Sequence, residues 1–439
     1  MTTVETGGSR HVLVVGAGFA GLYAAMGLKG AVAAGHRVTV VNQESFFQYQ
    51  PFLPEVASGT IDPRAAVVPL RRVLKHCRIV IGAVTRVDHD AHEAYVRTAG
   101  GDERTIGYDI VVLAPGSRSR VLPVPGLAGH GIGFKTVQEA IYLRNHVLAQ
   151  LDVAASEEDA ARRRAALTFV FVGGGYAGVE ALGELEDLAR DAMENYPDLD
   201  PSETRWVLVD AAERILPELP DGLASYAQEL LQRRRIEIKL RTRLDSAEGG
   251  VISLSDGEAF PAETLVWTAG VKPSPLARES ALPVDEQGRL LVDRSLRVEG
   301  VDGAWGAGDA AAVPDVTTGG ISPPTAQHGL RQGKRVAANI EAVLAGRPLR
   351  PFEYANIGGV CSLGRYKGVA TVKGLRFKGF LGWFLHRSYH LLAMPTWTRR
   401  VKIAMDWTVA LLFPRDLAQL GSLGRPREPF EQASGDQPS

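Results

Sequence analysis

The stretch Val12-Leu-Val-Val-Gly-Ala-Gly-Phe-Ala-Gly21 decides the fold of the N-terminal part of the chain. An apolar run comes first, three glycines follow at the spacing G-x-G-x-x-G, and a run of small residues continues after them. Gly16 allows a tight turn, Gly18 lets the backbone approach a diphosphate, and Gly21 lets a helix pack closely on the strand. The free N–H groups at the start of that helix favour an anion. The stretch therefore predicts a strand, a turn and a helix that bind a dinucleotide.

A second strand, Arg37 to Val41, closes this unit about 20 residues on, as ribose binding requires. Asn42 stands at its end, where an acidic residue is usual. An amide can hydrogen-bond ribose hydroxyls without charge, so we expect either a weaker grip from Asn42 or a contact from Glu44.

The same plan recurs later in the chain, where the strand-like run Phe169 to Val172 leads into Gly173, Gly175 and Gly178. This second fingerprint again has the order strand, glycine turn and helix. Because the pattern occurs twice, neither glycine cluster is well explained as a turn without a ligand. The following strand, Trp206 to Val209, ends in Asp210. Its carboxylate suits a free ribose 2′-hydroxyl and repels a 2′-phosphate, which favours NADH over NADPH.

Arg214 lies four residues beyond Asp210. It is interpreted either as a phosphate ligand or as a solvated surface residue, and the sequence leaves both readings open.

Two dinucleotides in one chain predict a relay that uses both FAD and NADH. The segment Ala304 to Ala310 supports this, because a short apolar run delivers Asp309 beside Gly308, as a flavin ribityl chain would need. The predicted fold class is α/β, with two Rossmann-like dinucleotide-binding domains. Residues 1–120 and 286–355 are expected to form the FAD-binding domain, and residues 121–285 the NADH-binding domain.

Composition excludes several other classes of protein. The chain has 439 residues and a net charge of -1, which gives no reason to expect nucleic acid. Cys77 and Cys361 are its two cysteines, so we predict no disulfide framework, no metal site and a reducing compartment. Residues 1–10 lack the apolar core of a secretory signal, and no uninterrupted apolar run reaches the length of a membrane span.

Four segments, together with the two glycine turns, make the chain resemble the two-dinucleotide flavoprotein reductases and, within them, the type II NADH dehydrogenases. The resemblance runs from about His11 to Leu420. Its specific marks are Gln50–Gly59, Gly173–Glu184, Val266–Val271 and Pro324–His328. The resemblance implies an NADH:quinone oxidoreductase that passes a hydride from NADH to FAD and then reduces a quinone, without pumping protons.

The resemblance also implies roles for single residues. Glu180 matches a family carboxylate near the nicotinamide and the flavin, and Gln327 a residue on the quinone side; these two are the predicted catalytic residues. The predicted FAD contacts are Gly16, Gly18, Gly21, Asn42, Gly116, Asp309, Ala326 and Gln327. The predicted NADH contacts are Gly173, Gly175, Gly178, Asp210, Ala269 and Gly270.

The chain departs from the family at the quinone side, where the family pattern is Ala-Gln-x-Ala-x-Gln. Ala326 and Gln327 match, but Gly329 and Arg331 replace the second alanine and the second glutamine, with Gln332 one place later. An arginine here is compatible with a different acceptor or with an anionic reduced quinone. His328 is interpreted either as a hydrogen-bond donor to a quinone or as a packing residue.

Residues 356–423 are predicted to form a basic amphipathic helical segment, and residues 424–439 a disordered tail. From Tyr354 to Met405 there is no Asp or Glu but there are nine Lys and Arg residues, interleaved with aromatic ones. This pattern predicts a helix in a membrane interface, with a cap packed on the FAD domain or a homodimer surface as alternatives. The expected location is peripheral, on the cytoplasmic side of the cell membrane.

Two other functions fit the same motifs. One is a soluble NAD(P)H-dependent flavoprotein reductase with a protein or small-molecule acceptor. The other is a flavoprotein redox sensor that binds NADH and turns over slowly. The absence of a closely spaced cysteine pair argues against a dithiol relay and against sulfide:quinone reductases.

Overall fold

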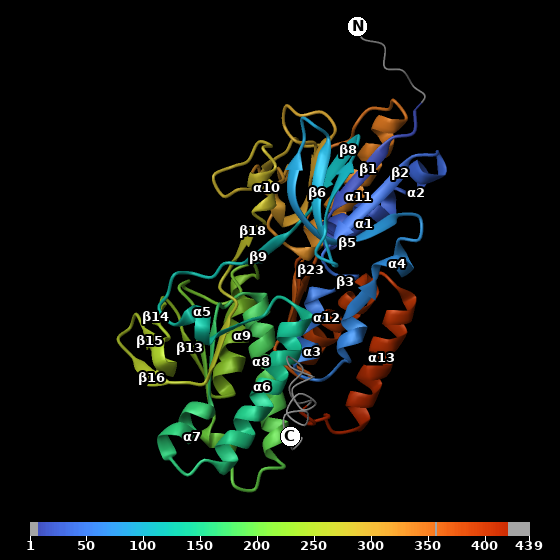
Figure 1. Cartoon of the computed structure of the whole chain (residues 1–439). Coiled ribbons are helices and arrows are strands. Elements are labelled where there is room, and N and C mark those ends of the chain that lie inside the picture. Colours follow the sequence, from blue (N-terminus) through green and yellow to red (C-terminus); the bar gives the residue numbers. More distant parts are fainter. Residues whose placement is uncertain (1–7, 356–357, 420–439) are drawn as a thin grey trace, which may run out of the picture.

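The molecule consists of two α/β lobes and a C-terminal cap (Figure 1). The computed structural model describes residues 8–355 and 358–419, and the cap comprises residues 354–355 and 358–419. The first lobe holds a seven-stranded sheet in the order β20-β8-β1-β2-β5-β6-β7. β1 pairs in parallel with β2 and β8, whereas β5, β6 and β7 form an antiparallel extension. The strands are β1 (His11–Val15), β2 (Arg37–Asn42), β5 (Arg78–Asp88), β6 (Glu93–Thr98), β7 (Glu103–Gly107), β8 (Ile110–Leu113) and β20 (Ala304–Gly306).

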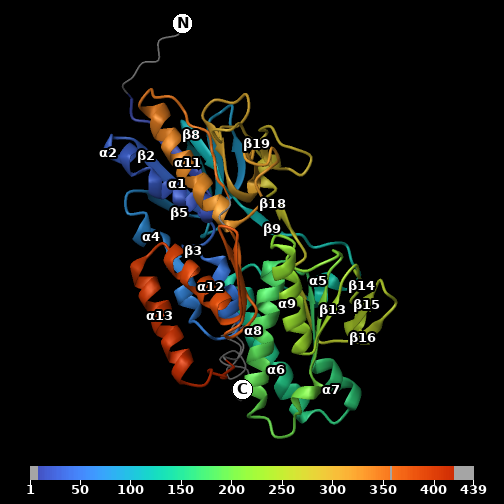
Figure 2. The same ribbon diagram turned by 180° about the vertical axis from the view of Figure 1, so that it is seen from behind.

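Helices α1 (Phe19–Gly27) and α11 (Ala326–Leu344) lie side by side on this sheet, as Figures 1 and 2 both show. Their close approach depends on Gly333, where a Cβ would lie 2.1 Å from the carbonyl oxygen of Ala20. The contact joins a helix from the start of the chain to one three hundred residues later. The first lobe is therefore built from two separated parts of the sequence.

The second lobe contains a five-stranded parallel sheet in the order β10-β17-β11-β12-β13. Continuous apolar runs form its central strands, because helices cover both faces. The strands are β10 (Gly131–Gly133), β11 (Thr168–Val172), β12 (Arg205–Val209), β13 (Ile236–Lys239) and β17 (Thr264–Trp267). The helices are α6 (Val137–Ser156), α7 (Ala160–Ala166), α8 (Tyr176–Met193) and α9 (Asp221–Arg233), and a small sheet of β14 (Leu244–Ser246), β15 (Val251–Leu254) and β16 (Ala259–Pro261) lies at one edge.

The chain crosses between the lobes twice, through β9 (Ser117–Ser119) on the way out and β18 (Val271–Pro273) on the way back. These two strands pair with each other in antiparallel fashion. The helix α10 (Leu276–Glu279) already contacts β5 of the first lobe. The return therefore precedes the predicted boundary at residue 285.

The C-terminal segment corrects one expectation, because its first part is a β-sheet and not a helix. β22 (Val360–Ser362), β23 (Gly368–Val372) and β24 (Leu375–Lys378) pair in antiparallel order before α12 (Gly379–Ala393) and α13 (Trp397–Leu412) begin. Glycines at positive φ, such as Gly374 at +85°, make the tight turns that a helix would not need. The predicted tail, residues 424–439, lies outside the described residues.

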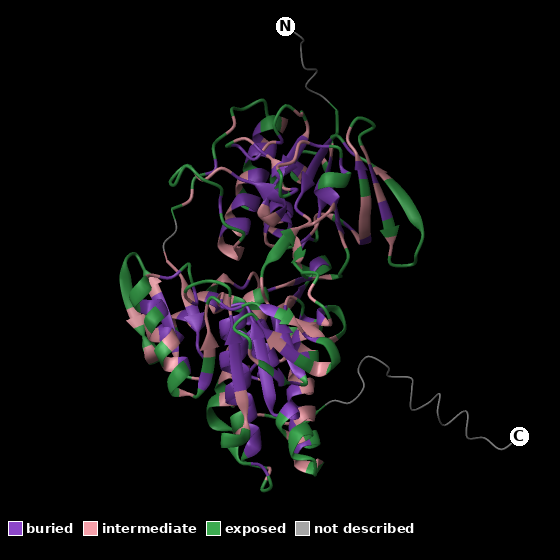
Figure 3. Ribbon diagram, turned by 90° about the vertical axis from the view of Figure 1, so that its left-hand side faces the viewer, coloured by how far each residue is buried: buried purple, intermediate pink, exposed green. Residues whose placement is uncertain are grey.

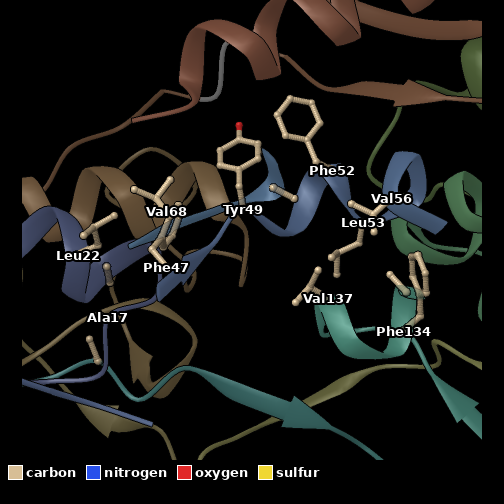
Figure 4. Close-up of a cluster of buried hydrophobic side chains, with 14 of the residues drawn as sticks. Ala17, Leu22, Phe47, Tyr49, Phe52, Leu53, Val56, Val68, Phe134 and Val137 are labelled. Atoms are coloured by element: carbon tan, nitrogen blue, oxygen red, sulfur yellow. The ribbon is translucent and has the colours of Figure 1, made fainter. Parts of the chain in front are cut away.

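The remaining short elements are distributed over both lobes. They are α2 (Lys29–Ala33), β3 (Phe46–Gln48), η1 (Gln50–Phe52), α3 (Leu53–Ala57), η2 (Pro63–Ala66), β4 (Val67–Pro69), α4 (Leu70–Val73), α5 (Leu127–His130), η3 (Pro201–Glu203), η4 (Glu248–Gly250), β19 (Leu290–Leu291), η5 (Gly308–Ala310) and β21 (Ala311–Ala312). Buried residues fill the centre of both lobes (Figure 3). Tyr49 and Phe52 are buried and extend this core toward the C-terminal helices, where their rings lie 5.8 and 6.0 Å from the ring of His390 (Figure 4).

Candidate active site

The first glycine turn has the geometry that the sequence predicts. Gly16 has a φ of +89°, and a Cβ there would lie 2.4 Å from the carbonyl oxygen of Ala114. A Cβ on Gly21 would lie 1.9 Å from the carbonyl oxygen of Gly16, so only glycine lets α1 pack on the turn. Gly18 is the N-cap of α1, and no atom lies within 4 Å of its ideal Cβ position. The space in front of the helix N-terminus is therefore open to a ligand.

A cavity of about 580 Å³ begins at this open space. It is lined by Gly16 and Gly18 in the turn, by Asn42 and Glu44 at the end of β2, and by the opposite wall of the first lobe. That wall includes Gly116, Ser117, Asp309 and Ala326, and Lys135 of the second lobe completes it. The predicted FAD contacts Gly16, Gly18, Asn42, Gly116, Asp309 and Ala326 thus share one cavity; Gly21 shapes the turn from behind it.

Asn42 stabilises the first glycine turn. Its Oδ1 accepts a hydrogen bond of 2.8 Å from the backbone N–H of Ala17, and its Nδ2 donates one of 2.8 Å to the carbonyl oxygen of Glu44. An aspartate could accept from Ala17 but could not donate to Glu44, which gives a reason for the amide. Glu44 is exposed and lines the cavity, so its carboxylate is free to meet ribose hydroxyls.

Asp309 belongs to a polar cluster that the sequence did not reveal. The Ser117 hydroxyl donates to Asp309 Oδ2 at 2.5 Å, and Lys135 Nζ donates to the Ser117 hydroxyl at 2.8 Å. Burial lowers the pKa of Lys135, while Asp309 and Glu139 act in the opposite direction. Lys135 follows β10 in the other lobe and has no motif around it except the capping box of α6, formed by Thr136 and Glu139.

The second glycine turn repeats the geometry of the first. Gly173 has a φ of +119°, and a Cβ on Gly178 would lie 1.9 Å from the Gly173 carbonyl oxygen. Gly175 is the N-cap of α8, with no atom within 4 Å of its ideal Cβ position. The N-terminus of α8 is therefore open in the same way as that of α1, which fits a second diphosphate.

Asp210 stands at the end of β12, beside this turn. Its carboxylate accepts hydrogen bonds from the backbone N–H groups of Gly174 and, at 2.7 Å, of Ala212. Arg214 forms an ion pair with Asp221 and donates to the carbonyl oxygen of Pro217 at 2.6 Å. The guanidinium of Arg214 thus binds neighbouring protein groups at the surface. This agrees with the interpretation of Arg214 as a surface residue.

Ala269 and Gly270 lie just after β17, in the connection to β18. Gly270 has a φ of +88° and open space at its ideal Cβ position. These two predicted NADH contacts stand at the carboxyl end of the same sheet as the second glycine turn, where ligands of such folds bind.

Glu180 is buried in the first turns of α8 and makes two contacts with the C-terminal cap. Its Oε1 accepts from the backbone N–H of Ser362 at 2.9 Å and lies 3.0 Å from Nε2 of His386. His386 is itself buried, in α12. Glu180 therefore joins the helix that begins at the second glycine turn to the cap, a link that no local sequence pattern could indicate.

The helix α11 begins at the cavity with Ala326, and its next residue, Gln327, points to the cap. Gln327 Oε1 accepts from the Tyr354 hydroxyl at 2.7 Å. His328 is buried, and its Nδ1 lies 2.7 Å from the hydroxyl of Thr325, the N-cap of α11. Burial lowers the pKa of His328, Arg331 adds to this effect, and Asp315 opposes it. These contacts fit the packing interpretation of His328.

The structure accounts for two departures from the family pattern in α11. A Cβ on Gly329 would lie 3.3 Å from the Cβ of Phe19, so the glycine relieves a tight contact with α1. Gln332 is buried, and its Oε1 accepts from the backbone N–H of Gly308 at 2.8 Å. The displaced glutamine thus supports the turn that carries Asp309.

Cys361 is buried and Cys77 is partly buried, and both are free thiols. Burial raises the pKa of both thiols, to about 12 for Cys77. Among the residues that the structure describes, no group of three or more His, Cys, Asp or Glu side chains is placed to hold a metal ion.

Each of the two α/β lobes has a glycine turn that is open to a ligand. Together the two turns define a flavoprotein of the two-dinucleotide class. Comparison with known proteins agrees. The model of the pyridine nucleotide-disulphide oxidoreductase family matches residues 10–333. Type II NADH:quinone oxidoreductase Ndh of Mycobacterium tuberculosis is 30% identical over 422 residues, which are 92% of this chain and 89% of that protein.

The type II NADH:quinone oxidoreductase of Staphylococcus aureus is 32% identical over 377 residues, which are 84% of this chain and 91% of that protein. The chain belongs to the pyridine nucleotide-disulphide oxidoreductase family and, within it, to the type II NADH:quinone oxidoreductases. The solved structure of NDH2 from Plasmodium falciparum in complex with NADH shares the fold, with a TM-score of 0.87 at 16% identity, over 94% of this chain and all of that one.

Proposed function

We propose that the protein is an FAD-dependent NADH:quinone oxidoreductase that does not pump protons, with FAD held in the first lobe and NADH in the second. The observation that carries the proposal is the pair of matching glycine turns, each with an open N-cap glycine at the start of a helix. Bound FAD would supply two-electron chemistry, taking a hydride from NADH and delivering its electrons to a quinone.

The residues of the chain bind and orient the reactants. The first N–H groups of α1 and α8 face the two diphosphates, where the helix dipoles favour negative charge. Glu44 binds the FAD ribose and Asp210 the NADH ribose. Lys135 provides a half-buried positive charge beside Ser117 and Asp309, at the wall of the FAD cavity. Glu180 and Gln327 act on the nicotinamide and quinone sides, as the family resemblance implies.

The cap supports a peripheral position on a membrane. Among the residues that the structure describes, no helix is long and apolar enough to span a bilayer. The outer face of α13 is apolar and exposed, with 74% exposure at Trp397, 63% at Met405 and 73% at Leu412. The exposed apolar residues on α12 are Phe380, Leu381, Phe384 and Leu392. An exposed apolar surface of this kind is typical of a helix in a lipid interface.

Lys402 and Asp406, which interrupt the apolar run Val401–Phe413, contact the protein. Lys402 Nζ lies 3.1 Å from Asp62 Oδ1, and Asp406 Oδ2 accepts from the backbone N–H of Asp62 at 3.1 Å. Both contacts are with Asp62, the N-cap of η2. Neither charge therefore lies on the outer, apolar face of α13. The cytoplasmic side of the membrane and a homodimer stay predictions from the sequence.

Stopped-flow spectroscopy tests the proposed function. The yellow holoenzyme is first reduced with NADH and then mixed with a short-chain quinone, and flavin absorbance follows both steps. Fast reduction and fast reoxidation are the expected result. Fast reduction with slow reoxidation by every quinone would favour a soluble reductase with another acceptor. Turnover below about 1 s⁻¹ with all acceptors would favour a redox sensor.

A further inference from the structure

A half-buried cluster lies between the N-terminus of α11 and the cap, at the place where the chain departs from its family. Gln327 contributes its side chain, Tyr354 its hydroxyl and Arg331 its guanidinium. The Tyr354 hydroxyl donates to Gln327 Oε1 at 2.7 Å, and Arg331 Nη1 donates to the Gln327 carbonyl oxygen at 2.9 Å. The guanidinium carbon of Arg331 also lies 4.1 Å from the centre of the Tyr354 ring. Each of the three residues therefore contacts the other two.

The hydrogen bond from Tyr354 fixes the direction of the Gln327 side-chain amide, while Arg331 donates to the backbone carbonyl oxygen of the same residue. Its oxygen is occupied by the Tyr354 hydroxyl, whereas its Nε2 has no protein partner among the described residues. A glutamine held in this way directs its two N–H donors away from Tyr354. It suits a ligand that presents a carbonyl oxygen, and Ala326 beside it already lines the FAD cavity.

Arg331 adds a positive charge near the same donors. It lies close to Tyr389 of α12: burial raises the pKa of the Tyr389 hydroxyl, and Arg331 acts in the opposite direction. Arg331 is only partly buried and has no ion pair with any described carboxylate. Its charge is therefore available to an oxygen that becomes negative.

We propose that Tyr354 and Arg331 are positioning residues that replace the missing second glutamine: together they hold Gln327 as a donor to a quinone carbonyl, and Arg331 favours an anionic reduced product. The inference rests on the proposed function. The quinone takes two electrons and one proton, originally from NADH, to give a hydroquinone anion, and a proton from water completes the hydroquinone. Gln327 binds the oxygen that carries the negative charge, and Arg331 stabilises that charge.

Quinone binding without turnover provides the first test. The oxidised holoenzyme is titrated with a short-chain quinone in the absence of NADH, and quenching of protein fluorescence gives the Kd. Tyr354→Phe removes the hydrogen bond to the amide and keeps the ring under Arg331. Loss of one such hydrogen bond predicts a Kd five- to tenfold higher, about 1–1.4 kcal/mol. Tyr196→Phe, which removes a hydroxyl bonded to Asp152 at 2.7 Å, is the matched control and should bind as the wild type does.

The anion preference is tested by stopped-flow reoxidation of the reduced enzyme. Arg331→Met should slow reoxidation by quinone about tenfold, whereas Arg331→Lys, which keeps the charge, should retain most of the rate. Reduction by NADH should be unchanged in all variants, and an unchanged flavin content and melting temperature would show that they fold. A merely structural role for Arg331 would make lysine and methionine equally harmful.

The outcomes separate this inference from the proposed function. If quinone reoxidises the wild type quickly, and Tyr354→Phe and Arg331→Met behave as the wild type does, the proposed positioning role of these two residues is wrong. The proposed oxidoreductase function is then unaffected. If the wild type itself is reoxidised slowly by every quinone, the proposed function fails, and the inference fails with it.

Discussion

The two N-cap glycines, Gly18 and Gly175, offer a test in which ligand binding changes and folding does not. Both have extended backbone, with φ and ψ of -70° and -163° at Gly18 and -75° and -178° at Gly175, so a branched residue fits each conformation. Neither has an atom within 4 Å of its ideal Cβ position. We therefore expect Gly18→Val to fold and lose FAD, and Gly175→Val to fold, keep FAD and bind NADH poorly.

The magnitude follows from the hydrogen bonds at each helix start. A side chain in front of the N-terminus keeps the diphosphate away from about two backbone N–H groups, each worth about 1.5–3 kcal/mol to a charged ligand. The expected loss in affinity is about 10²- to 10⁴-fold. The apoprotein should change little, because replacing glycine at an N-cap by an apolar residue costs about 1 kcal/mol or less, or under about 4 °C in Tm for a domain of this size.

Gel filtration followed by the ratio of flavin to protein absorbance measures FAD retention. Far-UV circular dichroism gives the melting temperature of the apoprotein, and titration gives the Kd for NADH. Gly21→Val is the contrasting variant, since its Cβ would lie 1.9 Å from a backbone oxygen and should destabilise the fold itself. A Gly18→Val protein that stays fully yellow, or one that melts as low as Gly21→Val, would refute the reasoning.

Three further predictions concern the second lobe and the cap. Asp210→Ala should raise the KM for NADH about tenfold with little loss of kcat, because it removes a ribose contact made equally in ground and transition states; a fall in kcat at constant KM would show that Asp210 is misplaced. Burial and the neighbouring His386 hold the pKa of His390 well below its usual value, so folding excludes a proton that the unfolded chain binds below about pH 6.5. Stability should therefore fall as the pH drops below that value, and His390→Gln should lose less in Tm between pH 7.5 and 5.5 than the wild type; equal slopes would contradict this. Trp397→Glu should weaken binding to vesicles at least tenfold in a flotation assay, whereas Val153→Glu, at a site 45% exposed on α6, should not; equal binding of both variants would remove α13 from the membrane contact.

The parts of the site that the sequence could predict are those in which function and local geometry coincide. The two glycine turns need three glycines within six residues, because the backbone of the turn, the helix start and the strand all meet there. The elements around them were predictable for the same reason. The segment 360–378 was not, since its basic and aromatic residues resemble an amphipathic helix, and only the glycine turns at its ends indicate a sheet.

The rest of the site depends on contacts between distant parts of the chain. Lys135 reaches Ser117 and Asp309 from the other lobe, and Glu180 lies beside a histidine 206 residues later. The Asn42 amide, predicted as a cofactor contact, accepts from Ala17 in the glycine turn and donates to the carbonyl oxygen of Glu44. Such pairings have no periodicity or spacing rule, so the residue types alone could not reveal them.

The basic segment shows how one pattern can serve two purposes. Residues 354–405 contain no acid, and α8 is rich in acids that face them. Arg365 accordingly lies 3.9 Å from Asp191, and Lys367 lies 3.5 Å from Asp187, a carboxyl group whose pKa is lowered by Arg234 and Lys367 against the effect of burial.

These ion pairs hold the cap against the second lobe, whereas the packing alternative placed the cap on the FAD domain. On α13 itself, Lys402 and Asp406 contact Asp62 of the first lobe, whereas Trp397, Met405 and Leu412 are exposed. Packing on the fold and contact with a membrane are therefore not competing readings of this segment, because the first creates the surface that the second needs.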